Sequence, residues 1–408
     1  MSSASTSLLF VDLVLIIVVA QVGSWLAVRL GQPPVIGEIL AGILLGPTIF
    51  GHGSVDSVFP RESLSYLSAF ANVGVAIFMF VVGLEIDASV LRGHRRPVLT
   101  VSLFAYVLPF ALGFAVGFTV LLREHATNRL AFALFLGAAL SVTAFPVLAR
   151  ILADRGLIHT EIGQLGLASA AVDDVLAWCV LAGVIGYAGA ASGSHWRLLL
   201  AIPFILILRC AQRPLAWLSR LDTRHGNRLM TYAAIAGALI SGAATEWMGL
   251  HLIFGAFVFG VVFPRDARTA VEDNATLVSS IFLPAFFIVA GLRVDLRGID
   301  HTAYLELLAI IAIAFLGKFG GAYLGARCFL PPKGAGAVAA LMNTRGLTEL
   351  IVLAVGLNLG LLGPSTYSLL VIMAVLTTMM TGPLLRLFDT RSRTDRPSNQ
   401  ASVAAETR

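Results

Sequence analysis

The stretch GQLGLASAAVDDVLAWCVLAGVIGYA, residues 163–188, combines a membrane-length apolar run with two adjacent carboxylates, Asp173 and Asp174. A helix that crosses a hydrocarbon core about 30 Å thick needs roughly 20 apolar residues, which this stretch supplies. A charge at the bilayer centre costs about 2.5–3.5 kcal/mol on insertion scales, so both carboxylates are functional candidates by default. The stretch therefore predicts a transmembrane helix with charged groups near its middle.

The rest of the chain has the same apolar character. Hydrophobic residues make up 58% of the 408 residues, charged residues make up 12%, and the mean hydropathy is +0.88. Soluble domains have roughly 45–50% apolar and about 25% charged residues, so a water-soluble fold is excluded. We expect an all-α polytopic membrane protein with about 13 transmembrane helices, of which the ninth is short. The candidate spans lie near 8–28, 34–50, 64–85, 98–122, 130–153, 163–188, 198–218, 229–247, 249–264, 276–294, 303–326, 334–358 and 366–388.

Positive charge indicates how the chain is oriented in the membrane. Lys and Arg favour cytoplasmic loops, and most of the 28 Lys and Arg residues fall on one side if the N-terminus is outside and the C-terminus cytoplasmic. We therefore interpret the net charge of +5 as the topology signal of a cell inner (plasma) membrane protein, and we expect no nucleic-acid partner. The three cysteines are too widely separated for a disulfide framework or a zinc site.

Two similar stretches indicate an internal repeat. Residues 78–87 read FMFVVGLEID and residues 286–295 read FFIVAGLRVD, and a Gly-spaced apolar span precedes each. An odd number of crossings separates them, which favours the inverted-topology repeats of secondary transporters. The alternative is that Gly-rich apolar helices simply look alike. We expect one transmembrane domain and a polar tail, divided as follows: 1–388 for the domain, with a first repeat 8–188, a linker helix 198–218 and an inverted repeat 229–388, then 389–408 for the tail.

Lys318 is a third charge expected at mid-membrane, within the span 303–326. It is one of only two lysines in a chain that otherwise uses arginine. Lys differs from Arg in that its protonation responds readily to burial. Successive helical residues point about 100° apart, so Asp173 and Asp174 cannot both face one neighbour. We expect one to pair with Lys318 and the other to face a water-filled cavity; a closed ion-pair network that only joins helices is the alternative.

Two further spans contain signs of interruption. In SVTAFPV, residues 141–147, Pro146 lacks an amide donor and breaks the helical hydrogen-bond ladder. NTRGLTEL, residues 343–350, places a glycine and two charges, Arg345 and Glu349, at membrane depth. Irregular backbone persists there only where it lines a cavity or is buried in protein. Because Arg345 and Glu349 are four residues apart, they could instead simply pair along one helix.

Together these segments resemble the monovalent cation:proton antiporter-2 family, the part of the sodium/hydrogen exchanger group with Kef-type and plant CHX-type members. The resemblance covers residues 8–388. Its motifs are VDDV (172–175), TAFPVLAR (143–150), RGLTEL (345–350) and GLE (83–85).

The resemblance implies an NhaA-like antiporter fold, in which a six-helix core moves against a dimerisation domain, usually in a homodimer. It implies that Asp174 binds the cation or the proton, that Asp173 pairs with Lys318 and that Thr143 helps to shape the site. We carry Arg345, Glu349 and Pro146 over only as accessory candidates. Kef-type members also have a large cytosolic nucleotide-binding domain that this sequence does not contain, so we do not expect gating of that kind.

These observations predict exchange of Na⁺ and/or K⁺ for H⁺ by competition for Asp174, with no cofactor and no enzymatic activity. Two alternatives remain open: a transporter of the same fold that exports an organic solute, and a passive cation channel. An intramembrane aspartyl hydrolase needs two carboxylates that meet across a gap, and adjacent residues do not supply that geometry. The choice between Na⁺ and K⁺ is also left open.

Overall fold

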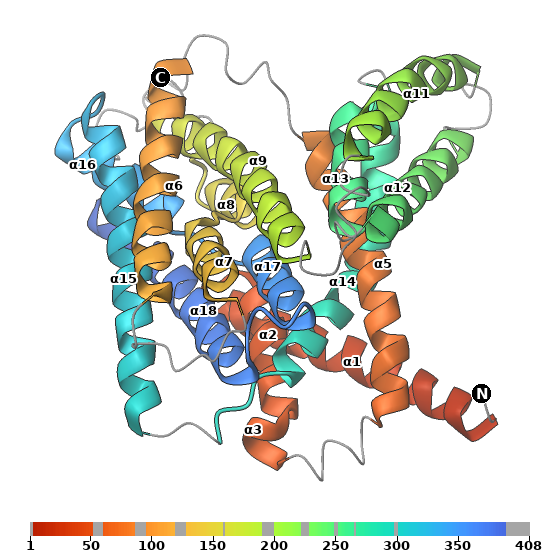
Figure 1. The fold of residues 1–408 in the computed structure, drawn as a ribbon, viewed down its shortest axis with the longest axis horizontal. Helices are drawn as coiled ribbons and strands as arrows, with labels where there is room; N and C mark the ends of the chain where they lie inside the picture. Colours follow the sequence, from red (N-terminus) through yellow and green to blue (C-terminus); the bar gives the residue numbers. More distant parts are fainter. Residues whose placement is uncertain are drawn as a thin grey trace, which may run out of the picture.

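The structure is a computed structural model, and all of its regular secondary structure in the part of the chain that it describes is helical (Figure 1). It describes residues 3–51, 60–85, 95–118, 128–157, 160–189, 200–221, 228–248, 252–264, 267–297 and 301–388. The helices are α1 (Ser3–Arg29), α2 (Pro34–Leu45), α3 (Pro47–Phe50), α5 (Arg61–Glu85), α6 (Arg95–Gly117), α7 (Arg129–Ser141), α8 (Phe145–Asp154), α9 (Glu161–Gly189), α11 (Ala201–Leu221), α12 (Arg228–Met248), α13 (Leu252–Val262), α14 (Arg268–Leu292), α15 (His301–Arg327), α16 (Pro332–Met342), α17 (Leu347–Asn358) and α18 (Pro364–Leu387).

The expected all-helical membrane architecture is confirmed. Each of the thirteen candidate spans coincides with one helix or with a pair of short helices in sequence. Seven of the described helices are long and apolar enough to cross a membrane, and shorter apolar helices accompany them. Helix α13, in the ninth span, has only 11 residues. At about 1.5 Å per residue it is roughly 16 Å long, too short to cross a bilayer alone. The expected polar tail, 389–408, lies outside the described residues.

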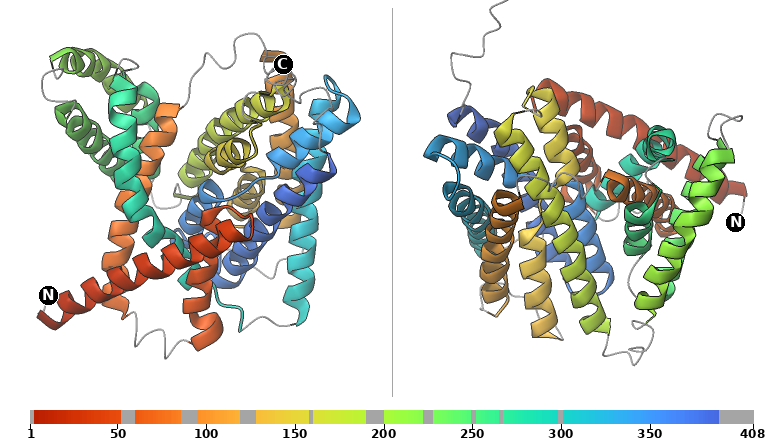
Figure 2. Two further views of the ribbon diagram at one scale, coloured as in Figure 1. Left: turned by 180° about the vertical axis from the view of Figure 1, so that it is seen from behind. Right: turned by 90° about the horizontal axis from the view of Figure 1, so that it is seen from above.

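The helices divide into two groups; in Figure 1, α6, α9, α15 and α16 lie to the left, α5 and α11–α14 lie to the right, and α1–α3 lie below and between them. We call α6–α9 and α15–α18 the core group, and α1–α3, α5 and α11–α14 the scaffold group. The most extensive helix contacts lie within groups: α6 packs on α15 and α7, and α5 packs on α14 and α13. From behind, α1 is seen to run obliquely across the lower part of the molecule (Figure 2, left). The boundary between the two groups is therefore a seam of comparatively sparse contact.

Glycines allow the scaffold helices to approach backbone to backbone. A Cβ added to Gly42 of α2 would lie 2.5 Å from the Ile288 carbonyl oxygen of α14, and Gly291 of α14 faces α2 in return. Gly83 of α5 and Gly260 of α13 pack against each other in the same way. Close packing through small residues drives helix association in lipid, where the hydrophobic effect between helices is absent.

A glycine stripe on α15 determines where Lys318 lies. Gly317, Gly321 and Gly325 occur at four-residue spacing, so they share one face of the helix. A Cβ at Gly317 or at Gly325 would come within 2.9 Å of a backbone atom of α6, and one at Gly321 would meet the Phe104 carbonyl. The stripe therefore seats α15 directly on α6. Lys318 follows the first glycine of the stripe and is 0% exposed.

Candidate functional site

The site is built where two interrupted helices cross inside the core group. Helix α7 ends at Ser141 and α8 begins at Phe145, while α16 ends at Met342 and α17 begins at Leu347. The two non-helical segments between them are in contact, because the Ala144 amide donates a hydrogen bond of 3.0 Å to the Thr344 carbonyl. The crossing thus brings four helix ends together in the protein interior.

The first interruption lies before the proline that predicts it. Residues 142–144 have no regular secondary structure, and Pro146 is the second residue of α8. Proline is tolerated in the first turn of a helix, because the amide that it lacks has no intrahelical partner there. Pro146 therefore marks the start of the second half-helix, whereas the ladder is broken just upstream of it.

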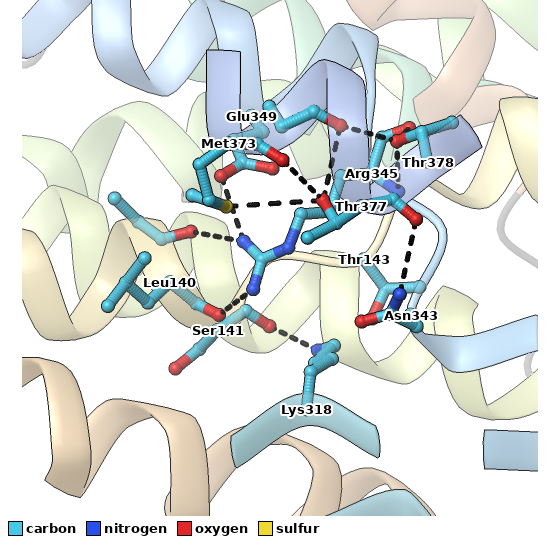
Figure 3. Close-up of polar contacts among 12 residues, drawn as sticks. Leu140, Ser141, Thr143, Lys318, Asn343, Arg345, Glu349, Met373, Thr377 and Thr378 are labelled. Carbon is cyan, nitrogen blue, oxygen red and sulfur yellow. Dashed lines mark hydrogen bonds and ion pairs between the residues drawn. The ribbon is translucent and has the colours of Figure 1, made fainter. Parts of the chain in front are cut away.

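Two cations satisfy the free carbonyls at the end of α7 (Figure 3). The Arg345 guanidinium donates to the Leu140 carbonyl at 2.6 Å and lies 3.4 Å from the Ala139 carbonyl. The Lys318 ammonium donates to the Ser141 carbonyl. The last carbonyls of a helix have no intrahelical partner and carry the negative end of the helix dipole. Arg345 and Lys318 therefore stabilise a helix end that would otherwise be costly to bury.

Asp173, Lys318 and Thr143 form a closed polar group at the crossing. The Lys318 Nζ atom lies 2.7 Å from Asp173 Oδ2, and both side chains are 0% exposed. The Thr143 hydroxyl donates to the same carboxylate oxygen at 2.8 Å. This is the arrangement that the family resemblance implies. The three side chains come from α9, from α15 and from the break between α7 and α8, so the group joins three elements.

Asp174 is the next residue on α9 and is 1% exposed. The charge of its carboxylate acts on the Lys318 ammonium, as does the positive charge of Arg345. The 100° turn between neighbouring helical residues gives Asp174 a different direction from Asp173. Helix α9 therefore contributes two buried carboxylates in different surroundings, one of them held by Lys318 and Thr143.

Arg345 pairs with Glu349, as expected for residues four apart on one helix, but it also contacts carbonyl groups of α7. Its Nη1 atom lies 2.8 Å from Glu349 Oε1, and both side chains are 0% exposed. Glu349 stands in the first turn of α17, where a negative charge complements the positive helix end. Arg345 itself lies in the break, and its guanidinium reaches across to the α7 carbonyls. The pair consequently connects the two interrupted helices instead of bridging one helix face.

Threonines of α18 hold the second break in place, and the sequence prediction did not single them out. The Thr378 hydroxyl lies 3.0 Å from the Arg345 amide nitrogen and 2.8 Å from its carbonyl oxygen. The Asn343 amide group donates to the Thr377 carbonyl at 3.2 Å. The available signal was the pair of adjacent threonines, Thr377 and Thr378, buried within an otherwise apolar span.

The site lacks the features of a resident metal centre. No group of three or more His, Cys, Asp or Glu side chains that could hold a metal ion occurs in the described ranges. All three cysteines are free.

The cavities along the seam differ in volume on the two sides of the crossing. On one side, about 260 Å³ lies between α2, α5, α14 and α8, lined among others by Glu38 and Val147. Val147 would be 2.9 Å from a Cβ at Gly346, which is in the second break. A further cavity of about 460 Å³ adjoins the same Pro33–Pro34 segment. On the other side the seam cavity measures only about 80 Å³.

Comparison with known proteins agrees with this geometry. The family model described as the transmembrane sodium/hydrogen exchanger matches residues 14–388. Cation/H(+) antiporter 18 of Arabidopsis thaliana is 38% identical over 392 residues, covering 93% of this chain and 48% of that protein. The Na(+)/H(+) antiporter NhaS4 of Synechocystis is 37% identical, covering 94% and 98%. The chain thus spans about half the length of the plant relative and nearly all of the cyanobacterial one.

A solved structure supports the fold independently. The sodium proton antiporter MjNhaP1 of Methanocaldococcus jannaschii superposes with a TM-score of 0.62 over 94% of this chain and 96% of that one. The identity is 15%, so this likeness concerns the fold alone. The family model and the curated relatives confirm the resemblance to monovalent cation:proton antiporters, a family of secondary transporters and not of enzymes. The match to the family model over residues 14–388 shows that the chain belongs to the sodium/hydrogen exchanger family.

Proposed function

We propose that the chain is a secondary antiporter that exchanges a monovalent cation, Na⁺ or K⁺, for H⁺. The observation that carries the proposal is the buried set of Asp173, Asp174 and Lys318 at the crossing of two interrupted helices. Charges at this depth are costly and mark ion pathways, and discontinuous helices are the usual binding sites of transporters. The printed names of the relatives, cation/H(+) and Na(+)/H(+) antiporters, support the same class of activity.

In the proposed mechanism, Asp174 binds either a dehydrated cation or a proton, and never both. Competition for one carboxylate couples the two fluxes, because each departing ion must be replaced by the other before the site changes sides. Lys318 neutralises Asp173 at 2.7 Å, and Thr143 fixes the same carboxylate. The charge on Asp174 is then the one that changes during the cycle. The ends of the half-helices supply partial charges around it.

We also propose that the core group moves against the scaffold group, so that Asp174 faces each side of the membrane in turn. The order of elements supports a pair of inverted repeats: α6, α7 with α8, and α9 are matched by α15, α16 with α17, and α18. The unequal cavities support an arrangement that is open on the Pro33–Pro34 side. With the N-terminus outside, as the distribution of Lys and Arg indicates, that side is cytoplasmic. The proposed assembly is a homodimer in the plasma membrane.

The test is a proton-flux assay in proteoliposomes. Vesicles that contain a pH-sensitive dye and an imposed pH gradient receive Na⁺, K⁺ or Li⁺ at several pH values. We expect cation addition to move protons uphill with the unaltered chain, which a passive channel does not do. Asp174→Asn should abolish this movement, because the amide cannot exchange a proton for a cation.

The matched control is Asp273→Asn, the same chemical change at an exposed position on α14. It should leave the flux unchanged. Full cation-driven proton movement in Asp174→Asn vesicles would refute the assignment of the site. Proton movement with none of the three cations, but with an organic solute, would favour the alternative substrate class.

A further inference from the structure

The end of the seam opposite the Pro33–Pro34 segment, which we call the outer end, is closed by contacts between the two helix groups. Helices α14 and α17 end there, and α18 begins there. The seam cavity at this end measures only about 80 Å³. Both groups line it, with Phe286 and Ala290 of α14 on one side and Ala354 and Asn358 of α17 on the other.

A buried tyrosine crosses the seam at the outer end. The hydroxyl of Tyr367, on α18, donates to the Ala290 carbonyl of α14 at 3.0 Å, and the Tyr367 side chain is 0% exposed. Ala290 is among the last four residues of α14, whose carbonyls have no intrahelical partner. A buried carbonyl without a partner is costly. The core group therefore supplies, through Tyr367, a contact that the end of the scaffold helix needs.

Two further hydrogen bonds join the same helix ends. The Arg293 guanidinium donates to the Asn358 side-chain oxygen at 3.0 Å, and the Asp295 amide donates to the Ser368 hydroxyl at 3.1 Å. Arg293 directly follows α14, and Asn358 is the last residue of α17. The guanidinium consequently also complements the negative ends of both helix dipoles. We call the three hydrogen bonds that Ala290, Arg293 and Asp295 make with the core group the outer latch.

We propose that the outer latch is a gate, in which Tyr367 and Arg293 set how often the outer end of the seam opens. The proposal deepens the proposed function and rests on its movement of the core group against the scaffold group. Opening the outer end separates α14 from α17 and α18, so it breaks all three hydrogen bonds. Water that enters then satisfies the freed groups. Each bond therefore biases the equilibrium towards the closed state by its net value and does not lock it.

Removing the Tyr367 hydroxyl should weaken the gate measurably. In Tyr367→Phe, the Ala290 carbonyl is left buried without its partner while the seam is closed, whereas water hydrates it when the seam is open. The loss of a partner by a buried acceptor should shift this equilibrium about fivefold or more. Asn358→Ala removes the bond to Arg293 at an exposed position. Its effect should be smaller, about twofold, and the exposed position should let the variant fold normally.

Thiol accessibility measures the opening without any transport. Ala354, which lines the outer cavity and is 8% exposed, is changed to cysteine in a chain whose three free cysteines have been replaced by serine. The full-length protein in detergent is reacted with a charged maleimide, and the rate of reaction is followed. We expect the rate of the Ala354→Cys thiol to rise about fivefold or more in Tyr367→Phe and about twofold in Asn358→Ala.

Two controls separate opening of the seam from a general disturbance. Tyr232→Phe makes the same chemical change at a 68% exposed position on α12 and should leave the rate unchanged. Ala340→Cys lies within the core group at a 0% exposed position, and its thiol should stay equally slow in Tyr367→Phe. The proposal is overturned if Tyr367→Phe and Asn358→Ala both leave the Ala354→Cys rate unchanged. A comparable rise in Tyr232→Phe, or at the Ala340→Cys thiol, overturns it as well.

Exchange provides a side-specific readout of the same gate. A site that faces outward for only a small fraction of the time binds an outer cation with an apparent affinity reduced by that fraction. In vesicles of known orientation, Tyr367→Phe should lower the half-saturating concentration of Na⁺ or K⁺ added on the outer side, by up to the factor seen in thiol accessibility. The value on the inner side should change little.

The two assays also separate this proposal from the proposed function. A rise in thiol accessibility without the side-specific change refutes the effect on exchange and supports the gate itself. Absence of cation-driven proton movement in the unaltered chain refutes the proposed function, and the thiol comparison still decides whether the outer latch controls opening.

Discussion

Replacing Lys318 by methionine tests how tightly the buried charges are coupled. The change keeps the length of the side chain but removes the ammonium that lies 2.7 Å from Asp173 and donates to the end of α7. Removing one partner of a buried ion pair costs about 3–5 kcal/mol, because the remaining charge is left uncompensated. Replacing both charged partners by neutral groups is often close to neutral in stability.

These values translate into a measurable shift. An unfolding entropy of about 2.1 cal/mol/K per residue over 408 residues gives about 0.9 kcal/mol/K. A loss of about 3–5 kcal/mol then lowers the unfolding temperature by about 3.5–6 °C. Helices that persist in detergent reduce the unfolding entropy, so this shift is a lower bound. We expect Asp173→Asn to be similarly destabilised and the Asp173→Asn, Lys318→Met double variant to be no less stable than either single variant.

The assay is thermal unfolding of the four purified proteins, analysed as a double-mutant cycle. Lys333→Met provides the control, since Lys333 is the other lysine of the chain and is exposed near the start of α16. Its effect should stay within about 0.5 kcal/mol. The reasoning fails if Lys318→Met melts at the same temperature as the unaltered chain. It also fails if the double variant shows the full sum of the two single losses.

Four other outcomes are expected. Arg345→Lys keeps the charge but loses the fork that reaches the α7 carbonyls, so stability should fall by about 1.5–3 kcal/mol; an unchanged unfolding temperature would contradict this role. Thr378→Val removes the hydroxyl that binds the Arg345 backbone at the second break. The free energy of unfolding should fall by about 1–3 kcal/mol, measured in the same way. Gly321→Val pushes α15 away from α6 and should lower the free energy of unfolding by about 1–3 kcal/mol. Gly183→Ala has open space around the added atom and should not destabilise the protein. Equal effects of the two changes would refute the packing argument. Competition at Asp174 predicts that the cation concentration for half-maximal exchange rises as pH falls, by up to about tenfold per pH unit, while the rate at saturating cation is retained; a pH-dependent maximum with constant half-saturation would rule out simple competition.

The helical architecture was predictable because bilayer thickness imposes a length requirement that the long apolar segments meet independently of one another. The candidate charges were predictable for a similar reason, since a carboxylate or an ammonium in an apolar span is visible without knowledge of its neighbours. The family resemblance implied that Asp173 pairs with Lys318, whereas the residues alone allowed either Asp173 or Asp174 to be the partner.

Other parts of the site depend on partners far away in the sequence. Thr378 looks like an ordinary polar residue of an apolar helix until α18 lies beside the second break. Arg345 and Glu349 suggest a local pair, and only the crossing shows that the guanidinium also serves the end of α7. The stretch around Pro146 predicted an interruption within residues 141–147, and the break at 142–144 lies inside it, because Pro146 itself fits the first turn of α8. The cavities depend on how the two helix groups meet, which no local pattern encodes.

The hydrogen bond from the Ala144 amide to the Thr344 carbonyl has a consequence for the energetics of turnover. It joins the two interrupted helices at their non-helical breaks. A displacement of one break along the membrane normal therefore favours the same displacement of the other. In the proposed mechanism, a bound ion would then move together with the two half-helix pairs, and its ligands would not need to be exchanged on the way. The barrier to transport would accordingly reside in the sliding of the apolar seam. Turnover should therefore respond to membrane thickness and lateral pressure more strongly than to small changes in ion size.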